Sequence, residues 1–198
     1  AGDAVQVKHY VTGDDALISL AGPANKQGRI IADNICGGDS RYLGSQGSSV
    51  IKVFDITAAT TGINETNAKK SGLEVDTVIL SPMSHAGYYP GGKVMTMKVV
   101  FEKDTYRLLG AQIIGYEGVD KRIDVLATAI HAGLKATQLK DLDLAYAPPY
   151  SSAKDPVNMA GFMIDNIAKG TLKQWHLEDM DKISKDKSVV LLDVRTVG

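Results

Sequence analysis

Residues 93 to 114 constrain the fold of this chain most, because they predict two strands joined by a tight turn. Lys93 to Phe101 alternates apolar and polar side chains, which places its apolar residues on one face of a strand. Glu102 to Thr105 turns the chain, and Tyr106 to Ile114 returns it. This pattern is typical of a β-hairpin. The chain is therefore expected to contain an antiparallel sheet.

The remaining segments carry further strand and helix patterns. Strands are predicted at residues 16–20, 50–54 and 75–80, helices at 22–36, 64–70, 118–132 and 154–168, and a short helical turn at 139–144. Glycine and serine residues between positions 37 and 48 indicate a connector. Strands clustered first, with helices after them, predict an α+β domain with an antiparallel sheet.

Two stretches depart from this pattern. Gly28 lies inside the first predicted helix, where glycine costs about 1 kcal/mol relative to alanine, so we expect a neighbour or a ligand to approach it closely. Residues 171–187 are polar and charged, and Val189 to Val194 then predicts an apolar strand. Because a single strand cannot bury itself, this last unit is expected to be truncated or to lean on its neighbour.

The composition argues against several classes of function. The 22 basic and 23 acidic residues give a net charge of -1, and no basic block of the nucleic-acid-binding kind occurs. The apolar runs are too short for a membrane span. A single cysteine excludes an internal disulfide and a cysteine-built zinc site, and it makes the cytoplasm the expected compartment. The four histidines show no metal-ligand spacing, so no metal site is predicted.

Cys36, the one cysteine, is not expected to be a nucleophile. It falls at the C-terminal end of the first predicted helix, where the negative end of the helix dipole disfavours a thiolate. The chain also lacks the G-x-G-x-x-G motif of a dinucleotide-binding fold. Neither a nucleotide-binding fold nor a catalytic cysteine is therefore predicted within these residues.

Four segments together resemble one family. They are Ala1–Ala4 with Leu20–Arg29, Leu108–Gly115, Tyr146–Asn158 and Leu191–Arg195. In this order they resemble the end of the FAD domain, the central hairpin of the dimerisation domain, the end of that domain, and the first core strand of a rhodanese domain. The first three segments thus resemble parts of FAD-dependent pyridine nucleotide–disulfide oxidoreductases. The resemblance covers nearly the whole chain, with its segments in the family's order.

The resemblance implies that the chain is the C-terminal part of a longer protein. Residues 1–40 would be the end of its FAD-binding domain, and residues 41–170 its dimerisation domain. Residues 171–198 would be a linker and the first strand of a truncated rhodanese-like domain. The family's nucleophilic cysteine would lie upstream. The chain alone is therefore expected to be an inactive module that forms a homodimer and binds no cofactor stably.

Within the family, the chain is most similar to coenzyme A disulfide reductases and to related NADH oxidases and persulfide reductases with a fused rhodanese domain. Classical disulfide reductases carry a His–Glu pair in the loop that matches Tyr146 to Asp155, whereas this loop holds tyrosines and no histidine. That departure favours the single-cysteine class. The resemblance implies a parent enzyme that uses FAD and NAD(P)H to reduce coenzyme A disulfide or persulfide. An NADH oxidase or peroxidase is the alternative.

The resemblance assigns catalytic roles to tyrosines in two loops. Tyr88 and Tyr146 are expected to reach the active site of the partner subunit, with Tyr89 and Tyr150 as alternates. A phenol can hydrogen-bond a sulfur atom and can supply a proton. The competing interpretation is that these tyrosines simply pack at a dimer interface, where the residue is common. His85 could assist, but it is more often a residue that hydrogen-bonds its own loop.

The resemblance also assigns flavin contacts near the start of the chain. Asp3 is expected to accept a hydrogen bond from the ribityl chain of FAD, because a carboxylate is a strong acceptor. The helix start, built from Leu20, Ala21, Gly22 and Pro23, would aim free N–H groups and a positive dipole end at the flavin ring. Taken without the resemblance, the same residues read as a turn aspartate and an ordinary helix start.

Overall fold

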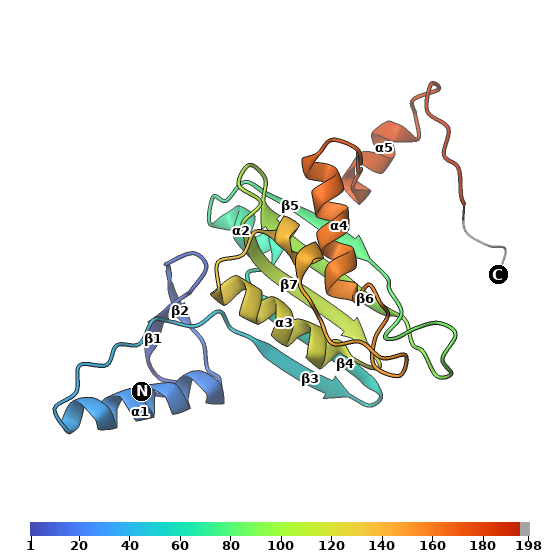
Figure 1. Ribbon diagram of the computed structural model, residues 1–198. Helices are drawn as coiled ribbons and strands as arrows, with labels where there is room; N and C mark the ends of the chain where they lie inside the picture. Colours follow the sequence, from blue (N-terminus) through green and yellow to red (C-terminus); the bar gives the residue numbers. More distant parts are fainter. Residues whose placement is uncertain (195–198) are drawn as a thin grey trace.

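A five-stranded antiparallel sheet forms the centre of the computed structural model, which describes residues 1–194 (Figure 1). Its strand order is β3-β4-β7-β6-β5. The strands are β3 (Ser49–Val53), β4 (Ile56–Gly62), β5 (Val75–Leu80), β6 (Met95–Glu102) and β7 (Leu108–Gly115). The predicted hairpin is the pair of β6 and β7, with Val99 opposite Ala111. The predicted α+β class with an antiparallel sheet is confirmed.

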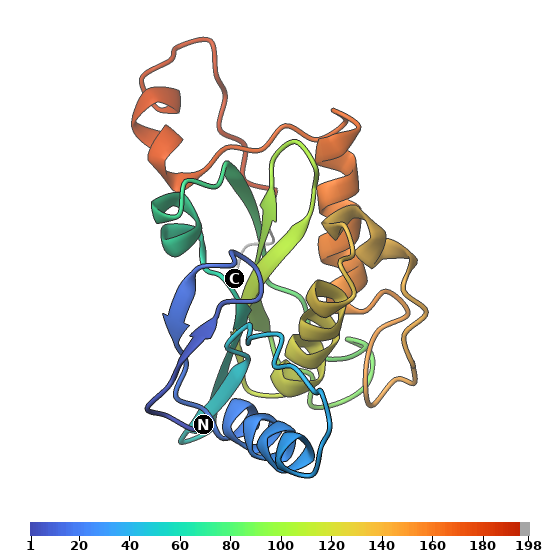
Figure 2. The same cartoon turned by 90° about the vertical axis from the view of Figure 1, so that its left-hand side faces the viewer.

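Two helices cover one face of the sheet (Figure 2). α3 (Val119–His131) contacts β4 and β7, and α4 (Pro156–Ala168) packs on the short 3-10 helix η1 (Ala136–Asp141). α2 (Glu65–Lys70) joins β4 to β5 and begins after Asn64, whose side chain accepts a hydrogen bond from the N–H of Asn67. The three corresponding helix predictions are confirmed to within two residues, and the predicted helical turn begins earlier, at Ala136.

The core lies between this helical layer and the sheet. Met97 and Val99 on β6 and Leu126 on α3 are fully buried, and burial of each such side chain contributes about 1.5–3 kcal/mol. A glycine permits the close approach of α4 to η1. A Cβ atom built on Gly161 would lie only 2.2 Å from the backbone nitrogen of Lys140. These contacts fix where α4 begins, and therefore where the loop before it ends.

The first residues of the chain form a smaller unit. β1 (Gln6–Lys8) pairs antiparallel with β2 (Asp15–Leu17), and α1 (Ala21–Ile35) follows. Tyr10 ties this unit to the larger domain, because its N–H donates to the carbonyl of Ser45 and its ring stacks on His131 at 5.1 Å. The side chains of Ile31 and Ile35 on α1 are exposed. These two apolar side chains of α1 are therefore uncovered within the described residues.

The segment after α4 returns to the edge strand of the sheet. The side chain of Gln174 donates to Asp76 and to the carbonyl of Thr77, and Nε2 of His176 lies 2.9 Å from a carboxylate oxygen of Asp76. The short helices η2 (Leu177–Asp179) and α5 (Met180–Ile183) follow. Residues 171–179 are therefore anchored to β5 rather than detached from the domain.

The structure departs from the sequence-based expectations at three places. β4 was not predicted, because its sequence Ile-Thr-Ala-Ala-Thr-Thr-Gly shows no apolar alternation, yet it pairs on both sides. Val189 to Val194 forms no strand, and its apolar side chains are exposed. The predicted segment continues into Arg195–Gly198, which lie outside the described residues. At Gly28 a Cβ would meet no described atom within 4 Å outside the backbone of its own helix, so no neighbouring segment approaches it, and the approach of a ligand stays a prediction.

Acidification is expected to weaken the attachment of α2 to the sheet. Glu65 accepts hydrogen bonds from Lys69 of the same helix and from Lys98 of β6, and these lower the pKa of its carboxyl to about 2. A folded-state pKa below the unfolded value of 4.5 means that the ion pairs stabilise the fold above pH 4.5 and lose that effect as the pH falls towards 2. Because these groups are partly exposed, we expect less than about 1 kcal/mol.

The test compares the free energy of unfolding of the native chain and of Glu65→Gln, from urea titrations at pH 7 and pH 3. The difference between the two proteins should shrink by about half at pH 3, because much of the wild-type advantage is then lost. Asp104→Asn, at an exposed turn between β6 and β7, is the control and should change little. A difference that is equal at both pH values would contradict the assignment.

Candidate functional site

Two loops lie side by side at one end of the sheet, next to the N-terminal end of α3 (Figures 1 and 2). The first runs from residue 81 to 94, between β5 and β6, and the second from residue 142 to 155, between η1 and α4. The N–H of Ala86 in the first loop donates to the carbonyl of Ser151 in the second at 3.0 Å. The two loops therefore form a continuous rim, which we call the tyrosine rim because it carries Tyr88, Tyr89, Tyr146 and Tyr150.

Tyr88 and Tyr146 meet at the tip of this rim. Their hydroxyl oxygens are 2.8 Å apart, and both side chains are exposed. The hydrogen bond between Tyr146 and Tyr88 raises the pKa of the Tyr146 phenol above its ordinary value. Tyr146 is therefore protonated at neutral pH. One of the two hydroxyl protons is used between the rings, and the other is free to be donated outward.

The two alternate tyrosines are placed differently. Tyr89 packs edge-on against the ring of His85, with centroids 5.5 Å apart. The ring of Tyr150 is exposed, and its backbone carbonyl accepts a hydrogen bond from Arg122. His85 itself is buried, and its Nδ1 lies 3.1 Å from the carbonyl of Ala86. His85 therefore hydrogen-bonds its own loop, and only Tyr88 and Tyr146 join their hydroxyl groups.

A buried ion pair lies directly beneath the rim. Arg122 of α3 is 1% exposed, and its Nη2 lies 2.9 Å from a carboxylate oxygen of Asp155. Burial raises the pKa of the Asp155 carboxyl, but hydrogen bonds from Arg122, the N–H of Val157 and the hydroxyl of Ser151 outweigh burial, so this pKa lies below its usual range. Asp155 is therefore ionised and pairs with Arg122 at neutral pH.

The sequence contains a signal for this ion pair that was missed. Arg122 falls in the apolar stripe of α3, three residues after Val119 and four before Leu126. A charged residue inside such a stripe must find a buried partner. Asp155 followed by Pro156 is in turn a helix-start signature, and the Asp155 side chain does accept from the N–H of Val157. Together these features could have identified the pair.

The predicted flavin contacts come together at the start of α1. The hydroxyl of Ser19, just before this helix, donates to the carbonyl of Asp3 at 3.3 Å, and the N–H of Gly2 donates to the side chain of Gln27 at 2.8 Å. α1 begins at Ala21, one residue before the predicted start, and Pro23 is its third residue. Proline is still tolerated there, because the first-turn N–H groups have no partner within the helix.

The helix start fits an electron-rich ligand. Leu20 precedes the helix and offers no side-chain cap, and the first turn contains no acidic residue. The N–H groups of Ala21 and Gly22 are therefore available, with the positive end of the helix dipole behind them. Gly22 and Pro23 also border a cleft of about 540 Å³ between α1 and α3. The Asp3 carboxylate makes no hydrogen bond within the described residues, so it is available to a ligand hydroxyl.

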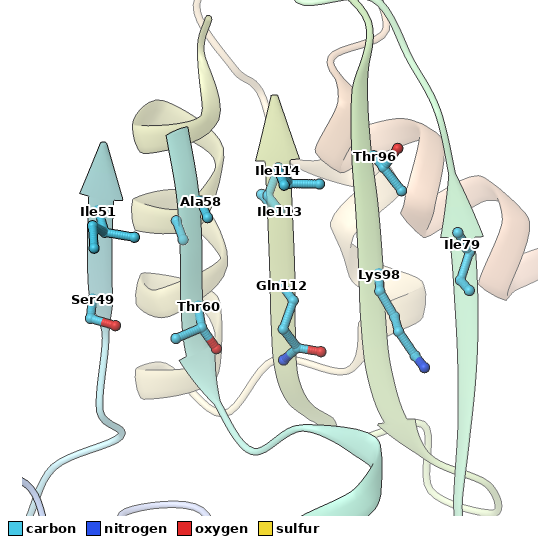
Figure 3. A pocket seen from close by; sticks show the side chains of 11 residues that line it. Ser49, Ile51, Ala58, Thr60, Ile79, Thr96, Lys98, Gln112, Ile113 and Ile114 are labelled. Carbon is cyan, nitrogen blue, oxygen red and sulfur yellow. The ribbon is translucent and has the colours of Figure 1, made fainter. Parts of the chain in front are cut away.

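The face of the sheet opposite the helices forms a shallow hollow of about 490 Å³ (Figure 3). Ile51, Ile79 and Ile114 project from it, and Lys98 at its edge is paired with Glu65. Its lining contains no histidine, cysteine or carboxylate that could activate the serine and threonine hydroxyls there. This face is therefore not a candidate for chemistry.

Cysteine and metal chemistry are not organised within residues 1–194. Cys36 is exposed at the C-terminal end of α1, where the sequence placed it. No three His, Cys, Asp or Glu side chains in that range gather as a metal site requires. No helix in that range is long and apolar enough to cross a lipid bilayer.

Comparisons with known proteins give one consistent family. Residues 48–156 match the family described as "Pyridine nucleotide-disulphide oxidoreductase, dimerisation domain". The NAD(P)H sulfur oxidoreductase (CoA-dependent) of Pyrococcus abyssi is 38% identical over 157 residues, which are 79% of this chain and 35% of that protein. The coenzyme A disulfide reductase of Staphylococcus epidermidis is 36% identical over 162 residues, 81% of this chain and 36% of that protein.

Solved structures agree with these matches. The chain aligns with reduced Bacillus anthracis CoADR-RHD at a TM-score of 0.90 and 50% identity, covering 93% of this chain and 33% of that one. It aligns with an NAD-dependent persulfide reductase from A. fulgidus at 0.88 and 43%, covering 92% and 34%. The water-forming NADH oxidase from Lactobacillus brevis gives 0.81 and 26%, covering 87% and 38%. The chain spans about a third of the length of the curated relatives it matches.

Proposed function

Because this chain belongs to the pyridine nucleotide–disulphide oxidoreductase family and contains its dimerisation domain, we propose that it is part of an FAD- and NAD(P)H-dependent reductase of coenzyme A disulfide or coenzyme A persulfide. The relatives whose names carry this chemistry are 36–50% identical to it. In the proposed homodimer, the tyrosine rim of each subunit faces the thiol site of its partner. The observation that carries the proposal is the hydrogen-bonded pair of Tyr88 and Tyr146 at an exposed loop tip.

The tyrosine pair suits the reduction of an S–S bond. Two electrons that enter this bond break it and leave two thiolates, each of which can take up a proton. A phenol can hydrogen-bond a developing thiolate and can deliver that proton. Tyr146 carries its proton at neutral pH, as a phenol ordinarily does, and its bond with Tyr88 raises its pKa further. The pair would then act as the proton donor that a His–Glu pair supplies in classical disulfide reductases.

The nucleophile of this reaction is proposed to lie outside the 198 residues. Cys36 lies at the C-terminal end of α1, opposite to the end that carries the free N–H groups. A thiolate is not stabilised at that end. The second loop of the rim contains tyrosines and no histidine, which supports the single-cysteine class. The isolated chain is accordingly proposed to lack reductase activity, and a fused rhodanese domain after residue 171 stays a prediction.

The start of α1 is the proposed flavin contact. Asp3 would accept from a hydroxyl group of FAD, and the N–H groups of Ala21 and Gly22 would stabilise negative charge on its ring. Bound FAD would supply the two-electron relay from NAD(P)H to sulfur. The protein's own contribution here is a preformed, uncapped helix end beside a free carboxylate.

Removing either hydroxyl is the test of the proposal. In the intact reductase, Tyr88→Phe and Tyr146→Phe should each lower kcat/KM for coenzyme A disulfide by about 100-fold, the effect expected for a lost acid–base group. The bound flavin spectrum should be unchanged. Steady-state kinetics with NAD(P)H oxidation as readout measures the effect. Tyr116→Phe, an exposed tyrosine after β7, is the matched control and should retain full turnover.

Retention of normal turnover by both phenylalanine variants would refute the catalytic role of the rim. An NADH oxidase or peroxidase remains the alternative function, since a water-forming NADH oxidase has the same fold. The same purified enzyme decides between the two. Turnover with oxygen or peroxide that exceeds turnover with coenzyme A disulfide or persulfide would favour the oxidase.

A further inference from the structure

We infer that Arg122 is a positioning residue for the tyrosine rim: it holds the two loops in the one arrangement that lets Tyr88 and Tyr146 share a hydrogen bond. The importance of this arrangement for turnover rests on the function proposed above. The arrangement itself is a property of this chain alone. It can therefore be tested separately from the activity.

A single guanidinium group binds both loops at once. Nη2 of Arg122 donates to the carbonyl of Ser84 in the first loop at 2.9 Å. The same nitrogen lies 3.3 Å from the carbonyl of Tyr150 and 3.2 Å from the hydroxyl of Ser151, both in the second loop. The guanidinium is thus a junction of the two loops, beside the direct bond between Ala86 and Ser151.

The guanidinium cannot swing away from this position. Its Nε and Nη2 both approach the carboxylate of Asp155, at distances of 2.9 to 3.3 Å, and Nη1 donates to the carbonyl of Gly118 at the start of α3. Asp155 is itself fixed, because it caps α4 through the N–H of Val157. Contacts with the first residues of α3 and α4 therefore fix the guanidinium of Arg122, which in turn bonds both loops of the tyrosine rim.

Both tyrosines are close to their anchors. Tyr88 lies four residues after Ser84, in a turn that is closed by the bond from the N–H of Tyr89 to the carbonyl of Ala86. Tyr146 precedes Tyr150 by a similar turn, closed by the bond from the N–H of Tyr150 to the carbonyl of Ala147. Since each phenol is carried on a short closed turn, a displacement of either anchor moves the hydroxyl with it. A separation of about 1 Å would break the 2.8 Å bond.

Lysine cannot replace arginine in this role. A guanidinium offers five N–H groups from three nitrogens in a fixed plane, whereas an ammonium offers three donors from one atom. One ammonium could not at once bond the loop acceptors of Nη2, the Asp155 carboxylate at Nε and the Gly118 carbonyl at Nη1. Burial of the charge is also costly, and apolar side chains often fill such a place without loss of stability. A buried arginine that contacts both loops is explained by the order it imposes on the rim.

The direct test follows the phenols by NMR, with the ring Cζ carbons of tyrosine labelled with ¹³C. In the native chain, Tyr146 should titrate above the ordinary tyrosine pKa because of its bond to Tyr88. In Arg122→Lys, Tyr146 should return towards its ordinary value while the amide spectrum of the sheet is preserved. Ser151→Ala removes one contact of the guanidinium and the hydrogen bond from the Ser151 hydroxyl to Asp155, but leaves the bond from Arg122 to Ser84 in place. It should give a smaller change in the same direction, and it is the variant to use if Arg122→Lys fails to fold. Arg107→Lys, at a partly exposed arginine that pairs with Glu102, should leave Tyr146 unchanged.

The second test uses the intact reductase and a double-mutant cycle. Arg122→Lys should lower kcat/KM between about 10-fold and 100-fold, the cost of a misplaced reacting group. When Arg122→Lys is combined with Tyr88→Phe and Tyr146→Phe, kcat/KM should fall no further than in the phenylalanine variants, because Arg122 acts through those hydroxyls. A purely structural role would give additive losses and would overturn the inference, as would an unchanged titration of Tyr146. If the phenylalanine variants alone retain full activity, the proposed function fails, and the NMR result still decides the positioning role.

Discussion

Replacing Asp155 with alanine is expected to lower the free energy of unfolding by about 3–5 kcal/mol, because removal of one member of a buried ion pair leaves the other charge uncompensated. Arg122 is 1% exposed and would keep its charge without a counterion. The same substitution removes the side-chain cap of α4, which alone is worth about 1 kcal/mol. Urea denaturation followed by circular dichroism measures the loss.

The control for this prediction lies on the same helix. Asp165 pairs with Lys140 and Lys169 near the surface, and Asp165→Ala should cost less than about 1 kcal/mol. The loss in the free energy of unfolding for Asp155→Asn should fall between the losses for the two alanine variants, because an amide keeps an acceptor for the helix cap but not the charge. A loss at Asp155 no larger than that at Asp165 would show that the buried pair does not organise this part of the domain.

Gly161→Ala is expected to destabilise the domain by about 3 kcal/mol or more, the upper part of the range for overpacked cores. A Cβ atom at this position would lie 2.2 Å from the backbone nitrogen of Lys140 and 2.7 Å from the backbone carbon of Leu139. Neither atom belongs to a flexible side chain, so α4 and η1 would have to separate. Thermal or urea unfolding of the 198-residue chain measures the effect.

Gly28→Ala is the matched control, since both glycines lie inside helices. A Cβ at Gly28 meets nothing within 4 Å among the described residues, so alanine should stabilise α1 by about 1 kcal/mol through helix propensity. Slower amide hydrogen exchange over α1 would report this gain. Equal behaviour of the two alanine variants would contradict the close packing between α4 and η1.

Local patterns were sufficient to predict most of the sheet domain. The alternation in Lys93 to Phe101 and the return strand after Thr105 gave β6 and β7 to within two residues. The spacing of Ile123, Leu126 and Ile130 located α3, and all three are buried. These elements are predictable because one face of each is apolar and the other polar, so the local pattern records the direction of the core.

Features that depend on distant partners could not be predicted in this way. β4 consists of small and polar residues, and it is a strand because β3 and β7 pair with it on either side. Val189 to Val194 has the apolar pattern of a strand but forms none in the structure. The bond between Tyr88 and Tyr146 joins residues far apart in the chain. Arg122 connects three segments that no local window contains.

The strand order also implies a sequence of folding events. β5, β6 and β7 are consecutive neighbours, so they can assemble through short loop closures. β4 reaches β7 only across the whole β5–β6–β7 segment, as in the pairing of Thr61 with Ala111, and such non-local pairing slows folding. Until the β3–β4 hairpin docks, β7 is an open edge that can recruit strands from other molecules. We expect this docking to be the late, aggregation-sensitive step in the refolding of the domain.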